Sequence, residues 1–261
     1  MRRAVLANLC SAVLVAACGS GASSTTNASQ PQMFKGQISA LSVRALIRAW
    51  SEDAHRLFIT SQGGEIEAAL VLGRFLAERK IEVVVREYCL SACAHFVFAP
   101  ASRKRVEPYA LVGFHGTATA REQLLANSGR PELAKKYAAL ARKEQDFYDD
   151  VGISSSLLIQ PLRQVTPICY VPQERAPALI ATRVNFFVPS RKALIAQRVH
   201  NITGFWPESR QDIAAITRRI PSTVQATLRF EDRDGSGQEV DLEGISVCPA
   251  SLLMPKGQID G

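Results

Sequence analysis

LFITSQGGEI, residues 57–66, runs from an apolar strand through a glycine pair into the start of a periodic helix. Apolar residues continue at helical spacing to residue 79, and the β-branched run at 81–85 is typical of a strand buried on both faces. A strand, a helix and a second buried strand in this order predict two parallel strands joined by a crossover. The sequence therefore indicates an α/β fold with a mainly parallel sheet.

The same alternation extends in both directions from this unit. After residue 161 the pattern weakens, and a β-hairpin is expected where alternating residues at 223–230 and 240–242 flank a turn. The other predicted elements, in chain order, are a strand at 33–38, helices at 42–52 and 91–99, one or two strands at 106–114, and helices at 131–151 and 208–219.

The composition is that of an ordinary globular protein. Of 261 residues, 47% are hydrophobic and 21% are charged, which excludes a disordered chain, a collagen and a coiled coil. The net charge of +7 is spread along the chain, and its densest cluster, at 103–105, is typical of a solvated turn. No nucleic-acid partner is predicted.

The first 18 residues, MRRAVLANLCSAVLVAAC, are typical of a bacterial signal peptide, with two arginines, a short apolar stretch and small residues before Cys18. The apolar stretch is too short for a membrane span. VAAC, at 15–18, resembles a lipoprotein cleavage box, which predicts lipidation of Cys18 and a membrane anchor. Cleavage by the ordinary signal peptidase, leaving a soluble protein, is the alternative. Either way we expect a periplasmic protein, tethered by a flexible linker at 19–32.

Export places the remaining cysteines in an oxidising compartment. Cys89, Cys93, Cys169 and Cys248 allow three pairings, of which we favour Cys89 with Cys93 and Cys169 with Cys248, since the first two are close in sequence. They lack the repeated short spacings of a zinc site. Residues 232–243 match the spacing of a calcium loop, but strand-like flanks favour a hairpin turn, so no metal is predicted.

Three segments place chemically useful groups at consecutive strand ends. Gly63 and Gly64 offer backbone N–H groups, Ser91 begins a predicted helix within CLSAC at 89–93, and His115 ends a predicted strand. Together they supply a nucleophile, a base and donors for a developing oxyanion. Each also has a plainer use, as a turn, an N-cap or a core histidine. His95, one turn after Ser91, is expected to be packed rather than catalytic.

This order of motifs resembles the Clp protease/crotonase superfamily, and within it the proteolytic subunit of Clp protease and an exported group with a C-x-S-A-C segment. The matching motifs are FKGQI at 34–38 for the opening strand, ITSQGGEI at 59–66 for the oxyanion loop, and the basic turn and strand at 103–115. The resemblance covers residues 33–195. It implies repeated ββα units in a domain at 33–198, followed by a C-terminal extension at 199–261.

The resemblance also implies a role for each residue of the constellation. Ser91 is the expected nucleophile and His115 the expected base, with the N–H groups of Gly64 and Ala92 as the oxyanion hole. Removing one such donor typically costs about a hundredfold in rate or more.

The third member of a triad is where the sequence departs from the family. An aspartate is expected after the long helix, but TPICYV at 166–171 offers no acid. Asp150 is our candidate, Asp149 and Glu174 are the other nearby acids, and a dyad without an acid stays open.

The predicted function is that of an exported serine hydrolase, foremost a peptidase acting on a peptide or protein, with no cofactor. A catalytically inactive Clp-like scaffold or binding module at the envelope is the alternative, favoured by the missing acid and by a disulfide beside Ser91. Thioester chemistry of the crotonase kind ranks last, because coenzyme A is not expected outside the cytoplasm. The resemblance also implies a homo-oligomer, since such folds bury apolar helix faces against copies of themselves.

Overall fold

The computed structural model describes residues 31–164, 167–171, 179–182, 186–219 and 228–231 of the chain. Its main sheet has the strand order β1-β2-β3-β4-β9, with β5 paired to the second half of β3, and every pairing in it is parallel. This confirms the α/β class with a mainly parallel sheet. The strands are β1 (Gln32–Lys35), β2 (Arg56–Ser61), β3 (Glu82–Leu90), β4 (Arg103–Val106), β5 (Leu111–Gly113) and β9 (Ile202–Gly204).

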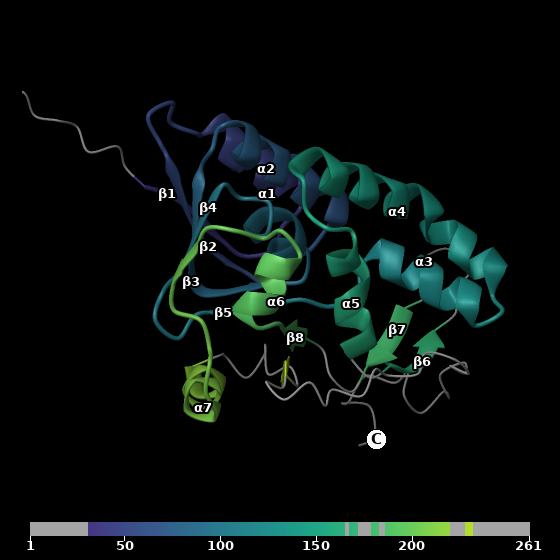
Figure 1. The fold of residues 1–261 in the computed structure, drawn as a ribbon. Helices are drawn as coiled ribbons and strands as arrows, with labels where there is room; N and C mark the ends of the chain where they lie inside the picture. The colour runs from purple at the N-terminus through teal and green to yellow at the C-terminus, as the bar shows by residue number, and fades with distance from the viewer. Residues whose placement is uncertain (1–30, 165–166, 172–178, 183–185, 220–227, 232–261) are drawn as a thin grey trace, which may run out of the picture.

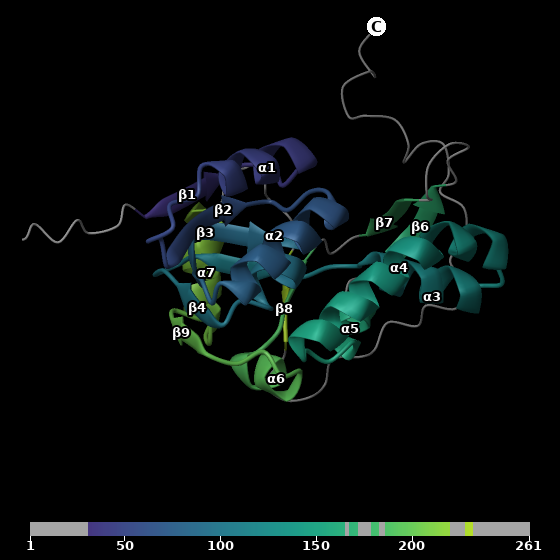
Figure 2. The same cartoon turned by 90° about the horizontal axis from the view of Figure 1, so that it is seen from above.

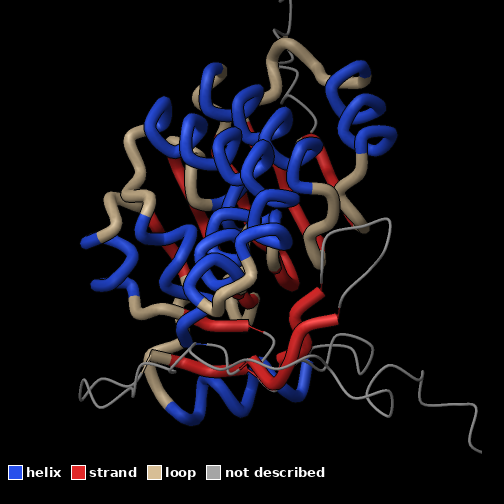
Figure 3. The backbone as a smooth tube through the Cα atoms, turned by 90° about the vertical axis from the view of Figure 1, so that its right-hand side faces the viewer, coloured by secondary structure: helices blue, strands red, loops and turns tan. Residues whose placement is uncertain are grey.

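Helices lie on both sides of this sheet. In Figure 1, α1 (Ala40–Arg48) and α2 (Ile66–Glu78) lie above the strands and α7 (Arg210–Arg219) lies below them. Figure 3 shows the same division from the side, with most of the helices above the strands. The view from above in Figure 2 shows α3 (Ala118–Asn127), α4 (Pro131–Val151) and α5 (Ser156–Gln164) grouped beside the sheet.

The remaining elements connect these layers. They are η1 (Ala94–Phe98), β6 (Pro167–Val171), β7 (Leu179–Thr182), β8 (Phe186–Val188), α6 (Arg191–Ala196) and β10 (Leu228–Phe230). The strands β8 and β10 form a second parallel pair, which joins the main body through an isolated bridge between Phe114 and Phe187.

The close contact between α2 and η1 depends on a glycine. A Cβ atom added to Gly73 would lie 1.9 Å from the carbonyl oxygen of Phe96, so only glycine lets the two helices approach this closely. β3 ends at Leu90, directly before the turn into η1, and its Val83 and Val85 are fully buried. The β-branched run and the glycine thus fix the segment that carries Ser91 against the core.

Several predicted features lie outside the described residues. They include the signal peptide, Cys18, the linker up to residue 30, and the turn and second strand of the C-terminal hairpin. Residues 202–204, which the sequence assigns to the C-terminal extension, form the edge strand β9 of the main sheet. Within the described part of the chain, no helix is both long and apolar enough to cross a membrane.

Candidate active site

Ser91 lies in the sharp turn between β3 and η1. Its φ of 57° is in the left-handed region, which a residue with a side chain adopts only at a cost of about 1 kcal/mol or more. Its N–H donates to the carbonyl oxygen of Gly113 in β5, at 2.9 Å. Its hydroxyl makes a hydrogen bond with Nε2 of His115 instead of capping its own helix. The structure therefore brings together the serine and the histidine singled out by the sequence.

A disulfide brackets this turn. Cys89, in β3, is bonded to Cys93, directly before η1, and their Cα atoms lie 5.2 Å apart. Both residues are fully buried. The bridge ties the end of the strand to the beginning of the helix around Ser91. For the second predicted pairing, the side chain of Cys169 and all of Cys248 lie outside what the structure describes.

The glycine pair lies directly against the serine segment. Gly63 has a φ of 93°, and a Cβ atom added to it would lie 2.6 Å from the carbonyl oxygen of Leu90 and 2.7 Å from Cβ of Ser91. Within the described residues, the N–H groups of Gly64 and Ala92 donate no hydrogen bond. The loop thus has two uncommitted donors from segments that lie side by side at the serine, as an oxyanion hole requires.

His115 follows β5 and is held from two sides. Its neighbour Phe114 exchanges backbone hydrogen bonds with Phe187 of β8, at 2.8 and 2.7 Å, and its imidazole packs against the ring of Phe186. Burial is the main cause that lowers the pKa of His115 from 6.5 to about 3, and the positive charge of Arg121 contributes to the same shift. The imidazole is therefore neutral at pH 7, the form that accepts a proton from a serine.

The structure does not bring Asp150 to this pair. Asp150 lies on the outer side of α4, with its side chain about half exposed, and forms an ion pair with Arg74 of α2 at 2.7 Å. Asp149 is also exposed, and Glu174 lies outside the described residues. Within the described part of the chain, no carboxylate makes a hydrogen bond with His115.

α4 instead turns Glu144 and Tyr148 inward, two residues that the sequence analysis did not single out. Glu144 is fully buried and accepts hydrogen bonds from the N–H groups of Ala118 and Thr119, at 3.0 and 2.8 Å, and from the Thr119 hydroxyl at 2.7 Å. Tyr148 contacts His95. The only signal for them in the sequence is their spacing of four, which places both on one face of a helix.

We expect acid to destabilise the fold through His95 and His115. Burial lowers the pKa of His95 from 6.5 to about 4 and that of His115 to about 3. As the pH falls below about 6.5, the unfolded chain takes up protons on these imidazoles and the folded chain does not. Each histidine then removes at most about 1.4 kcal/mol of unfolding free energy per pH unit. Urea titrations at pH 7, 6 and 5 measure this slope.

The variant His95→Gln is the matched control for that slope. Burial also raises the pKa of Glu144, so protonation of that side chain stabilises the folded chain as the pH falls, opposite to the effect of the histidines. Because Glu144 is present in both proteins, the difference between their slopes gives the contribution of His95. The variant should lose stability less steeply than the wild type between pH 6.5 and 5. Equal slopes in the two proteins would contradict the assignment of a buried neutral imidazole to His95.

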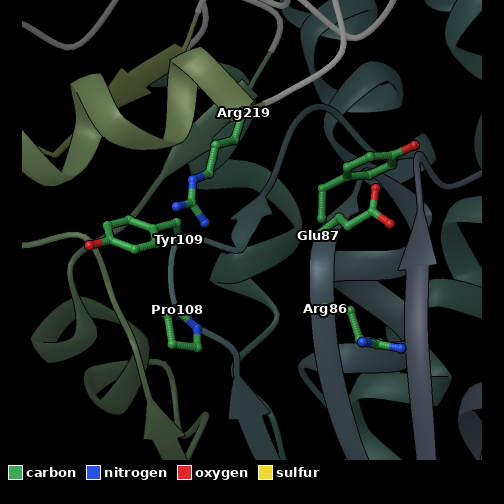
Figure 4. Close-up of a pocket in the computed structure, with 6 residues that line it drawn as sticks. Arg86, Glu87, Pro108, Tyr109 and Arg219 are labelled. Carbon is green, nitrogen blue, oxygen red and sulfur yellow. The ribbon is translucent and has the colours of Figure 1, made fainter.

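The structure also contains a pocket of about 110 Å³ that includes neither Ser91 nor His115. In it, the guanidinium of Arg219 lies 4.3 Å from the centre of the Tyr109 ring, and Figure 4 shows Arg219 reaching toward Tyr109 from α7. The lining residues are Arg86, Glu87, Tyr88, Pro108, Tyr109 and Arg219.

The described residues contain no group of three or more His, Cys, Asp or Glu side chains that could hold a metal ion.

Comparison with known proteins gave matches among solved structures. No family model matches the sequence, and no curated protein matches it. A point mutant of ClpP1 from Listeria monocytogenes matches with a TM-score of 0.38 at 15% identity, over 70% of this chain and 94% of that one. The ClpP catalytic domain from Plasmodium falciparum gives a TM-score of 0.34 at 11% identity, over 69% and 88%. A membrane protease specific for a stomatin homolog, from Pyrococcus horikoshii, gives 0.29 at 14%, over 77% and 89%.

Proposed function

We propose that this chain is an exported serine hydrolase that acts as a peptidase through Ser91 and His115. The observation that carries the proposal is the hydrogen bond between the Ser91 hydroxyl and Nε2 of His115, made from a turn with a left-handed backbone. A hydroxyl in contact with a neutral, half-buried imidazole is the arrangement that activates a serine nucleophile. The segments that carry the motif resemblance, at 59–66, 89–93 and 103–115, meet at this point.

The reaction follows from the positions of these groups. Oγ of Ser91 attacks the acyl carbon of the substrate while Nε2 of His115 takes the hydroxyl proton. The oxyanion that forms accepts hydrogen bonds from the N–H groups of Gly64 and Ala92. His115 then gives its proton to the departing amine, and a water molecule activated by the same imidazole hydrolyses the acyl-serine.

The location and the substrate class are inferred from the sequence. The leader at 1–18 supports export, and the VAAC motif supports a lipid anchor on Cys18. The order of the nucleophile, glycine and histidine motifs, which resembles that of Clp peptidases, supports a peptide or protein as the substrate. The same resemblance supports a homo-oligomer.

A second candidate is a Clp-like scaffold that binds without catalysis. Two observations favour it. Within the described residues no carboxylate orients His115, and the Cys89–Cys93 disulfide restrains the turn that a nucleophile occupies. A scaffold would keep both its fold and its binding activity after removal of the Ser91 hydroxyl.

Peptide cleavage tests the proposal. The purified full chain, in detergent, is incubated with casein and with a mixture of synthetic peptides, and mass spectrometry identifies the products. We expect new peptide termini with the wild type and none with Ser91→Ala. Ser102→Ala is the control, because the hydroxyl of Ser102 is buried, has no hydrogen-bond partner among the described residues, and lies outside the site. Products from Ser91→Ala at the wild-type rate, or none from the wild type, would contradict a peptidase.

A further inference from the structure

His95 makes hydrogen bonds with both members of the Ser91–His115 pair. Its backbone N–H donates to the carbonyl oxygen of Ser91 at 3.1 Å. Its side-chain Nε2 lies 2.8 Å from the carbonyl oxygen of His115. Because the hydroxyl of Ser91 in turn contacts the imidazole of His115, the three residues form a closed ring of hydrogen bonds.

The imidazole of His95 is itself fixed in place. It is 1% exposed, and it packs edge-on against the ring of Phe114 with centroids 5.0 Å apart. Tyr148 of α4, which is fully buried, places its hydroxyl 3.3 Å from Nδ1 of His95 and 3.1 Å from the carbonyl oxygen of the same residue. Such packing leaves the ring little freedom to turn.

The hydrogen bonds also define which nitrogen of His95 carries the proton. The partner of Nε2 is a carbonyl oxygen, which only accepts, so Nε2 must be the donor. Nδ1 then carries no proton and accepts from the hydroxyl of Tyr148, whose single proton is shared between Nδ1 at 3.3 Å and the carbonyl oxygen of His95 at 3.1 Å. Burial keeps this imidazole neutral at pH 7 by lowering its pKa to about 4, so the ring does not place a second positive charge beside His115 when that residue takes up a proton.

We infer that His95 is a positioning residue for catalysis: it ties the backbone of the base, His115, to the backbone of the nucleophile, Ser91. This inference rests on the proposed function. In a triad a carboxylate bound to the imidazole orients the base. Here the described residues provide no such carboxylate, and the His95 side chain instead holds the chain segment from which the base projects. His95 does not touch the substrate.

The test compares two substitutions at the same site. His95→Phe keeps a ring of similar size and removes the donor, which leaves the carbonyl oxygen of His115 without its partner. His95→Gln keeps an amide donor near the position of Nε2. We expect His95→Phe to slow acylation by about ten- to a hundredfold, because small displacements of reacting groups cost rates of this order. We expect His95→Gln to restore the rate to within about threefold of wild type.

Labelling with a fluorophosphonate separates positioning from a loss of folding. The final fraction of labelled protein counts folded sites, and the rate constant reports the reactivity of each site. Positioning predicts that His95→Phe reaches the wild-type fraction slowly. A structural role alone predicts a smaller labelled fraction with a wild-type rate constant. Equal rate constants for His95→Phe and wild type, or equally slow ones for His95→Gln and His95→Phe, would overturn the inference.

Tyr148→Phe is the second variant, for the case in which His95→Phe does not fold. It keeps His95 but removes the hydroxyl that makes the hydrogen bond with its Nδ1. We expect the rate constant of labelling to fall by about threefold to tenfold, at an unchanged labelled fraction. A wild-type rate constant in this variant would overturn the inference. If the wild-type protein itself is not labelled, the proposed function fails; if it is labelled and the His95 and Tyr148 variants match it, only the positioning role fails.

Discussion

Replacing His115 by alanine is expected to lower kcat/KM for a 4-nitrophenyl ester by about a thousandfold or more. Within the described residues, the imidazole is the only hydrogen-bond partner of the Ser91 hydroxyl, so its removal leaves the hydroxyl proton without an acceptor. Because the imidazole is neutral at pH 7, all of the wild-type protein starts in the reactive protonation state. Release of 4-nitrophenolate, followed by absorbance, measures the change.

The control for this substitution is His200→Ala. The side chain of His200 is exposed, and within the described part of the chain only its backbone carbonyl takes part in a hydrogen bond, as an acceptor from Lys104. This variant should keep the wild-type rate. If His115→Ala keeps more than about a tenth of the activity while folded, His115 is not the general base.

Replacing Glu144 by alanine is expected to lower the free energy of unfolding by about 3–5 kcal/mol. The carboxylate is fully buried and accepts three hydrogen bonds at the beginning of α3, from Ala118 and Thr119. Without it, the two backbone N–H groups stay buried without acceptors, and the Thr119 hydroxyl keeps only its longer hydrogen bond to the carbonyl oxygen of Ala141, at 3.3 Å. Urea unfolding followed by circular dichroism measures the loss.

The matched control is Glu132→Ala, on the same helix. The side chain of Glu132 is 81% exposed and, among the described residues, pairs only with Lys135, so its loss should change the unfolding free energy by less than about 0.5 kcal/mol. Similar effects of the two substitutions would contradict the assignment of Glu144 as a buried cap of α3. Since His115 lies only three residues before Ala118, we also expect Glu144→Ala to reduce activity.

The elements with strong periodicity are the ones that the sequence predicts well. The helix expected at 65–79 is α2 (Ile66–Glu78), and the one expected at 131–151 is α4 with the same bounds. α4 begins with Pro131 and is followed directly by Gly152, which adopts a left-handed conformation with φ of 72°. Proline and glycine at these ends are local signals that need no tertiary contact.

Helix α3 is not predictable in the same way. Its buried residues do not follow one apolar face. Thr117 caps the helix locally by accepting from the N–H of Ala120, but the other N–H groups at its start are bound by Glu144 from another helix. Tertiary contacts of this kind leave no local pattern. The π-helical turn in η1 likewise has no signature in the periodicity of residues 91–99.

The sequence predicts those residues of the candidate site that lie at the ends of strands. Ser91, His115 and the glycine pair meet because parallel strands deliver their carboxyl ends to one edge of the sheet. The choice of Asp150 depended on the rotation of α4, which the sequence does not specify. At about 100° per residue, Asp150 points to the opposite side of the helix from Tyr148, and Tyr148 is the residue that faces the site.

The most direct test of the account is the covalent labelling of Ser91. The full chain is treated with a fluorophosphonate at pH 7.5, and a tryptic digest locates the adduct by mass spectrometry. We predict one adduct per chain, on Ser91, that is absent from Ser91→Ala and present in Ser102→Ala. A folded wild-type protein that gains no adduct, or an adduct on another serine, would contradict the claim that Ser91 is an activated nucleophile.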